Sequence, residues 1–247
     1  MLLQTTFVQI ELKVHPLLQK NHEFWNHERS LTALLIYMSI SLFVWLPLSD
    51  YSDLWWGFLI IDILFNLIIL AGVFSVLTRW RNQIFFITIA ITVSLLRIVS
   101  FLTDNITLQL IGYVFAIVFF TLLARMVMQH IFKDGPVNHY RIEGSIVVFM
   151  IIGIIYAWLY TLLEALLPGS FAITEPSQNY RDLFSQFLYF SFVTMTTIGY
   201  GDMIATGSLA KSLVIFQGMI GLLYPVILIA RLVSLEVTHS SQSKKLY

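Results

Sequence analysis

The apolar segment LFSQFLYFSFVTM, residues 183–195, is followed directly by the glycine-containing stretch TTIGYGD, residues 196–202. A helix that crosses the hydrocarbon core of a bilayer needs about 20 residues, so this apolar segment is too short to span a membrane. It lies between two longer apolar runs, 144–167 and 212–235, that are long enough. We therefore expect residues 183–195 to form a re-entrant helix that ends inside the membrane, with the glycine-containing stretch beyond its end.

The glycine-containing stretch has features that suit a cation. A helix that ends at mid-membrane leaves its last carbonyls without helical partners and carries about half a negative charge at that end. An extended strand after it would present successive carbonyls to one axis. That arrangement needs backbone conformations that only glycine adopts cheaply, and Gly199 and Gly201 alternate with larger residues. Because rings of carbonyl oxygens replace the water shell of a potassium ion, the stretch predicts a potassium-binding strand.

The pentapeptide TIGYG at residues 197–201 resembles, at every position, the selectivity filter of the potassium channel family, which reads Thr-Val/Ile-Gly-Tyr-Gly. It also lies where that family places its filter, after a re-entrant helix and before the last span. The resemblance implies a homotetramer with four copies of the strand around one pore, K+ as the permeant ion and no cofactor. The implied K+ ligands are the carbonyls of Thr197, Ile198, Gly199 and Tyr200 and the hydroxyl of Thr197, with Gly201 as the last filter residue.

Residues on either side of the filter are candidates for its support. Tyr189 and Phe190 occupy positions where many members of the resembled family carry aromatic residues that brace the filter tyrosine, although Phe190 offers no donor. The alternative is that both rings fill space against the next subunit. Thr196 immediately precedes the filter, and Asp202 would concentrate cations at its outer mouth. Val193 stands where some bacterial members have a buried glutamate, so inactivation through a glutamate paired with Asp202 is not expected.

The whole chain has the composition of a polytopic membrane protein. Of its 247 residues 58% are hydrophobic and 11% are charged, and the mean hydropathy is +0.82. In soluble domains roughly 45–50% of the residues are apolar and roughly 25% are charged. This predicts an all-α membrane protein with six transmembrane helices, and with the re-entrant pore helix and extended filter between the fifth and the sixth. The predicted spans are Ser30–Leu48, Leu54–Leu77, Ile84–Leu102, Leu108–Ile131, Gly144–Leu167 and Ser212–Leu235.

Lysines and arginines indicate the orientation, since they are retained on the cytosolic side of short loops. Most of them fall on one side of the six-span layout, which predicts a multi-pass protein of the cell membrane, surrounded by lipid, with both termini in the cytosol. Basic and acidic residues balance at 14 each, so no positive field favours nucleic acid as a partner. The predicted domains are a cytosolic N-terminal segment at 1–29, a four-helix sensor-like frame at 30–131, a cytosolic linker at 132–143, a pore domain at 144–237 and a short cytosolic tail at 238–247. The N-terminal segment has the periodicity of an interfacial helix, with an unstructured tail as the alternative.

The last predicted span contains a candidate hinge. Pro225 has no N–H to donate to the carbonyl of Gly221, so a missing hydrogen bond coincides with a flexible residue. In the resembled family a glycine about midway along the inner helix, and often a proline below it, let the cytosolic end splay. We therefore predict a gating hinge formed by Gly218, Gly221 and Pro225. The alternative is that the two glycines, three residues apart, only permit close helix packing.

The fourth predicted span, 108–131, argues against steep voltage sensing. Voltage-gated members of the resembled family carry arginines at every third position there, because several charges must move through the field. Here Arg125 is the only arginine and lies near the cytosolic end. Moving one charge across the whole membrane is worth only about 2.3 kcal/mol per 100 mV. Steep voltage gating is therefore not expected.

Two intramembrane charges, Asp62 in the second predicted span and Arg97 in the third, require partners because an unpaired charge at such depth is costly. At about 1.5 Å per helical residue both lie roughly 8–12 Å below the outer boundary. We predict an Asp62–Arg97 ion pair that bridges the helices of the frame, with a sensing role as the alternative.

These observations favour a passive, potassium-selective channel over an enzyme. No serine with a base, no paired carboxylates within the spans and no histidine cluster suggests an intramembrane hydrolase, and the chain has no cysteine for thiol chemistry. A non-conducting regulatory subunit of a potassium channel would carry the same motifs and is one alternative. A potassium uptake transporter subunit is another, but such proteins have a single filter glycine per repeat and four pore loops per chain, whereas this chain has one complete filter.

Overall fold

The computed structural model describes residues 31–44, 47, 60, 63, 66–67, 80–103, 105–132, 139–173 and 180–244 of the chain. This described part is mostly helical. Its elements are α3 (Trp80–Thr103), α4 (Ile106–Ile131), α5 (His139–Leu166), β1 (Phe171–Ile173), α6 (Tyr180–Met195), β2 (Met203–Ala205) and α7 (Ser208–Lys244), and a further helical segment covers Leu31–Val44.

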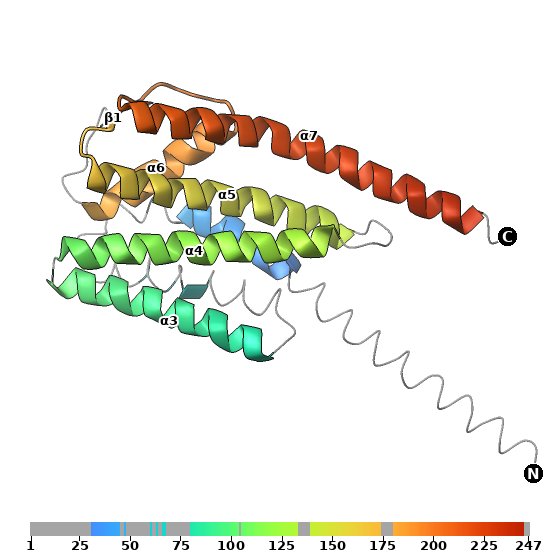
Figure 1. Cartoon of the computed structure of the whole chain (residues 1–247), viewed down its shortest axis with the longest axis horizontal. Helices are drawn as coiled ribbons and strands as arrows, with labels where there is room; N and C mark the ends of the chain where they lie inside the picture. Colours follow the sequence, from blue (N-terminus) through green and yellow to red (C-terminus); the bar gives the residue numbers. More distant parts are fainter. Residues whose placement is uncertain are drawn as a thin grey trace, which may run out of the picture.

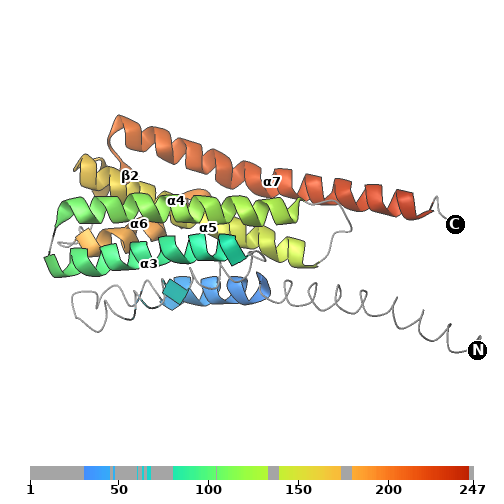
Figure 2. The ribbon, with the colours of Figure 1, turned by 60° about the horizontal axis from the view of Figure 1, so that its bottom comes forward.

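Helices α3, α4 and α5 lie side by side (Figures 1 and 2). α4 begins after Asn105, whose side-chain oxygen accepts a hydrogen bond from the Thr107 amide at 2.9 Å and caps the first turn. The segment Leu31–Val44 contributes to the same apolar core as α4 and α5. Buried members of this core include Leu34, Met38, Phe119, Phe120, Leu123, Val127 and Ile151.

α5 is the central helix, with contacts to α4, α6 and α7 (Figure 1). Half of its 28 residues are buried. Near its start the buried Glu143 accepts a hydrogen bond from Thr32 Oγ1 at 2.5 Å, and His139 Nε2 lies 3.0 Å from the second carboxylate oxygen. Halfway along, Gly153 lets α6 approach, because a Cβ at this position would lie 2.8 Å from the ring of Phe192. α5 therefore joins the first helical segment to the elements around the filter.

α6 and the glycine-containing stretch 196–202, called the filter stretch from here on, form a hairpin. The hairpin begins and ends beside the C-terminal end of α5. β1 follows α5 and β2 precedes α7, and the two strands pair antiparallel with Ala172 opposite Ile204. This pairing places the chain that enters the hairpin beside the chain that leaves it. Since α6 has only 16 residues, it is too short to span a bilayer, as its sequence predicts. The hairpin has the shape of a re-entrant segment between α5 and α7.

Within the described residues, three helical stretches are long and apolar enough to cross a membrane: Ile106–Gln129, His139–Leu166 and Ser208–Val237. The first two contain all but the last one or two residues of the predicted fourth and fifth spans, and the third contains the whole predicted sixth span. α7 begins before the predicted sixth span and continues to Lys244, so it is longer at both ends than expected. α3 contains the predicted third span, whereas most of the second lies outside the described residues. The layout with six spans stays a prediction.

Candidate functional site

The filter stretch is joined to the last turn of α6 by its own backbone. The amides of residues 196–199 donate to the carbonyls of residues 192–194, at N···O distances from 2.9 to 3.4 Å. The expectation that the last carbonyls of this helix lack partners is therefore wrong for residues 192–194, because the chain turns back and places its own amides there. A consequence is that a shift of the last turn of α6 must move the filter with it.

The filter backbone has a left-handed conformation at every second residue. The φ angles are 62° at Thr197, 55° at Gly199 and 83° at Gly201. In a regular strand successive carbonyls point to opposite sides, and reversing the sign of φ at alternate residues turns them toward one side. The two glycines were predicted to take such conformations, but Thr197 was not, since a threonine rarely adopts them. The sequence signal for a left-handed Thr197 is its position two residues before Gly199, in step with the alternation of the two glycines.

One chain leaves the filter open to its surroundings. All residues from Thr196 to Asp202 are exposed, and the exposed fraction reaches 71% for Tyr200. A Cβ built on Gly199 or Gly201 would meet nothing within 4 Å. A single chain thus supplies the stretch with alternating left-handed residues but no enclosure around it.

The two aromatic residues predicted to support the filter have different surroundings. The Tyr189 hydroxyl donates to Asp202 Oδ2 at 2.7 Å and so joins α6 to the residue that follows the filter. Phe190 is buried inside its own chain, with its ring centroid 5.4 Å from that of Tyr160 and 5.8 Å from that of Phe171. Phe190 therefore already has packing partners in its own chain, whereas Tyr189 contacts the outer end of the filter.

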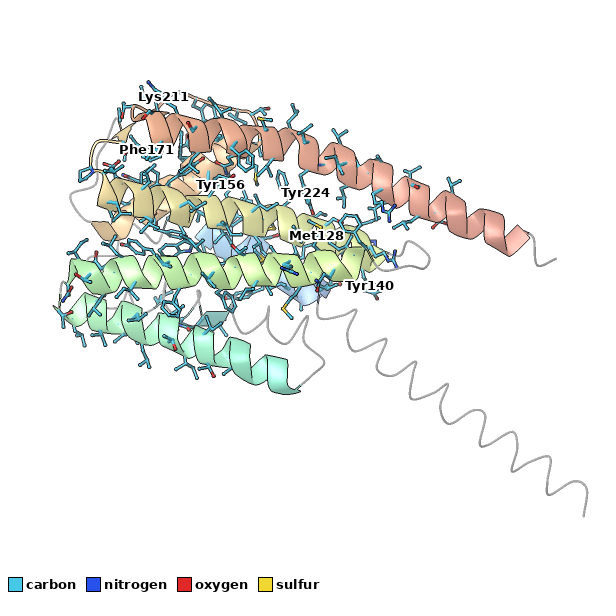
Figure 3. The ribbon with its side chains drawn as sticks, in the orientation of Figure 1. Met128, Tyr140, Tyr156, Phe171, Lys211 and Tyr224 are labelled. Atoms are coloured by element: carbon cyan, nitrogen blue, oxygen red, sulfur yellow. The ribbon has the colours of Figure 1, made fainter. Side chains whose placement is uncertain are left out.

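The end of the hairpin beside β1 and β2 is linked to the turn after α5 through contacts that the sequence does not indicate. Both carboxylate oxygens of Glu164 accept backbone hydrogen bonds, from Gly169 at 2.8 Å and from Phe171 at 3.1 Å. Thr206 donates its hydroxyl to Gly169 O at 2.6 Å and its amide to Ser170 O at 2.9 Å. The Pro-Gly dipeptide at 168–169 marked this turn in the sequence, but not its partners. These contacts hold both ends of the hairpin together; Phe171 and Lys211 mark this end of the molecule in Figure 3.

The candidate hinge residues lie on α7, which continues as a helix through Pro225. A Cβ at Gly221 would overlap the Met195 carbonyl oxygen at the end of α6, whereas a Cβ at Gly218 would meet nothing within 4 Å. Close packing therefore describes Gly221 and not Gly218 within this chain. A hinge at the same place stays a prediction.

The predicted ion pair lies outside the described residues, since neither Asp62 nor the side chain of Arg97 is among them. A hydrogen bond between Ser94 on α3 and Asn66 does join the two segments on which the pair was predicted. The pair stays a prediction.

The sequence model of the ion channel family matches residues 144–237, which contain most of α5, the α6 hairpin, the filter stretch and most of α7. No curated protein sequence and no solved structure matches the chain at a significant level. The matched family is one of ion channels and not of enzymes. Residues 144–237 of this membrane protein are thus an ion-channel pore domain.

Proposed function

We propose that the chain is the subunit of a homotetrameric channel that conducts K+ selectively and passively. The observation that carries the proposal is the backbone of the TIGYG segment, which has positive φ at residues 197, 199 and 201. Positive φ at every second residue is the conformation that can turn successive carbonyls toward one side. The proposal is also supported by the exposure of the same residues, which leaves room for other copies of the strand around a shared axis. The match of residues 144–237 to the ion channel family is consistent with this assignment.

Selective conduction follows from the exchange of water for carbonyl oxygens. A K+ ion that enters the filter loses its hydration shell, and the carbonyls of residues 197–200 from four chains replace it, with the Thr197 hydroxyl at the inner end. Successive sites of similar strength let the ion move on instead of remaining bound. The carboxylate of Asp202 raises the local concentration of cations at the outer mouth.

The surface of α7 supports assembly with other copies. Within its apolar window only 11% is buried inside the chain, against 61% for α5. Large apolar side chains such as Phe216, Leu223 and Ile227 are exposed along it. We propose that neighbouring subunits and membrane lipid cover this surface, because an exposed apolar helix of this length is costly in water.

We further propose that the channel is not steeply voltage-gated and that both termini are cytosolic. Arg125 is the only arginine of α4, which limits the charge that this helix could move through the field. Opening would instead use a hinge in α7 at Gly218, Gly221 and Pro225, where the helix lacks one backbone donor.

The function is tested by ion flux from liposomes that contain only this protein. We expect K+ release that needs no ionophore, exceeds Na+ release and is blocked by barium, with protein-free liposomes as the control. Equal release of Na+ and K+ would contradict the filter assignment. A stable tetramer without any flux would favour the non-conducting regulatory subunit.

Replacing Tyr189 by phenylalanine is expected to loosen the outer end of the filter, because it removes the hydroxyl that donates to Asp202 and keeps the ring. Ions that bind the folded filter stabilise the tetramer, so K+ should raise its thermal stability less in this variant than in the wild type. The loss should be about 1 kcal/mol or less, since the hydrogen-bonded pair is exposed to solvent. Thermal unfolding in K+ and in Na+ measures it, and an identical K+ effect in both proteins contradicts the prediction.

A further inference from the structure

A buried polar cluster connects α5, α6 and α7 behind the filter. Tyr160, Ser191 and Gln217 are each 0% exposed. The Tyr160 hydroxyl donates to Gln217 Oε1 at 2.5 Å. Gln217 Nε2 donates to both the hydroxyl and the backbone carbonyl of Ser191, at 2.6 and 3.1 Å, and the Ser191 hydroxyl donates to Gly153 O at 2.7 Å. The bonds form a circuit that starts and ends on α5 and passes through α7 and α6.

The hydrogen bonds fix the orientation of the Gln217 amide. A backbone carbonyl can only accept, so the nitrogen of the amide must face Ser191 and the oxygen must face Tyr160. Both N–H groups of Gln217 and its oxygen are thereby used. In a low-dielectric interior a polar group without a partner is costly, so this cluster favours one relative position of the three helices.

The cluster lies directly beside the attachment of the filter. Ser191 is followed within one turn by residues 192–194, whose carbonyls hold the amides of residues 196–199. On α7, Gln217 is four residues before Gly221 and so on the same face, where the helix touches the Met195 carbonyl. Gln217 therefore contacts α6 one turn away from the closest approach of the two helices.

Resting on the proposed function, we infer that Gln217 is a positioning residue for the selectivity filter. Through Ser191 it holds the last turn of α6 in a fixed place relative to the inner helix α7, and this turn carries the filter. Ion selectivity is thereby made dependent on a side chain of the inner helix that touches no ion. A movement of α7 at this level would change the filter by the same route.

The chain offers a matched control on the same helix. The Tyr224 hydroxyl donates to Ser145 O at 2.9 Å, and Figure 3 shows Tyr224 between α7 and α5. Gln217 and Tyr224 are seven residues apart, about two turns, so they project from similar faces of α7. The bond of Tyr224 joins α7 to α5 alone, whereas the bonds of Gln217 also reach α6.

The test is the K+/Na+ permeability ratio of purified channels in planar bilayers. Gln217→Leu removes the amide and its three hydrogen bonds at similar size, and it should lower the ratio by about tenfold or more, because loss of a single buried hydrogen bond already corresponds to as much as about tenfold. Tyr224→Phe should leave the ratio unchanged. An unchanged ratio in Gln217→Leu, or an equal fall in Tyr224→Phe, overturns the inference while leaving the channel assignment intact. A wild-type protein that does not discriminate K+ from Na+ overturns the channel assignment itself.

Three further variants separate the possible causes of the result. The double variant Tyr160→Phe with Gln217→Leu has no Tyr160 hydroxyl without a partner beside the new leucine. If the double variant recovers the wild-type K+/Na+ ratio, the lower ratio of Gln217→Leu is due to that hydroxyl, and the inference that Gln217 positions the filter is refuted. If Gln217→Leu does not assemble, Tyr160→Phe and Ser191→Ala each remove one hydroxyl from the circuit. A lower ratio in both supports the inference, and wild-type ratios in both refute it.

Discussion

Replacing Gly221 by alanine is expected to destabilise the pore domain more than the same substitution at Gly218, the other glycine of α7. The new Cβ would overlap the Met195 carbonyl oxygen and lie 2.9 Å from the carbonyl carbon. Both are backbone atoms at the end of α6, so the clash cannot be relieved by a change of rotamer. Overpacking of this kind costs about 1–3 kcal/mol at each site. Thermal unfolding of the purified protein measures the loss.

Gly218 is the matched control for this prediction. It lies on the same helix, and a Cβ there would meet nothing within 4 Å of its own chain. Gly218→Ala should keep or raise stability, by up to about 1 kcal/mol, because alanine favours helix. Equal losses in the two variants would mean that close approach to Met195 does not explain the requirement for glycine at 221.

Replacing Gly199 by alanine is expected to abolish potassium selectivity. Gly199 has a φ of 55°, and an L-residue held there costs roughly 1–2 kcal/mol in each subunit. Space is not the obstacle, since a Cβ at this position would meet nothing within 4 Å. The backbone can relieve the strain by returning φ to negative values, which turns carbonyls away from the common side. The flux ratio of K+ to Na+ in liposomes measures the effect.

Ile198→Ala is the comparison, because Ile198 does not have a positive φ and the substitution leaves the backbone conformation available. We expect this variant to remain more selective for K+ than Gly199→Ala. Wild-type selectivity in Gly199→Ala would show that the left-handed conformation at 199 is not needed for ion binding.

Several features could be predicted because they depend on local sequence. The length of residues 183–195 indicated a helix too short to span a membrane, and α6 is such a helix. The glycines at 199 and 201 indicated left-handed backbone, and both have positive φ. The fourth to sixth predicted spans correspond to helices because long apolar runs leave few other structures in a bilayer. These signals act over a few residues or one helix length.

Other features could not be predicted because they depend on which helices meet. Gln217 is a single polar residue in an apolar run. Nothing in that run indicates that Gln217 contacts Ser191, 26 residues away, and Tyr160, 57 residues away. Gly221 was predicted to be part of a hinge, with close helix packing as the alternative, but its contact with Met195 appears only when α7 crosses the end of α6. Thr197 takes a conformation that is unfavourable for its residue type, which only the surrounding hydrogen bonds can impose.

Hydropathy and backbone freedom are properties of the residues themselves, so the amino-acid order was enough to establish the membrane character of the chain and the place of the filter stretch. How this stretch is held depends only in part on local contacts, such as the bonds from the amides of residues 196–199 to carbonyls three to six residues earlier. The Tyr189–Asp202 bond joins residues 13 positions apart, and the Gln217–Ser191 bond joins residues 26 positions apart on α7 and α6. The tertiary structure decides the second of these, because a buried donor can bond only to an acceptor that the packed helices place within reach.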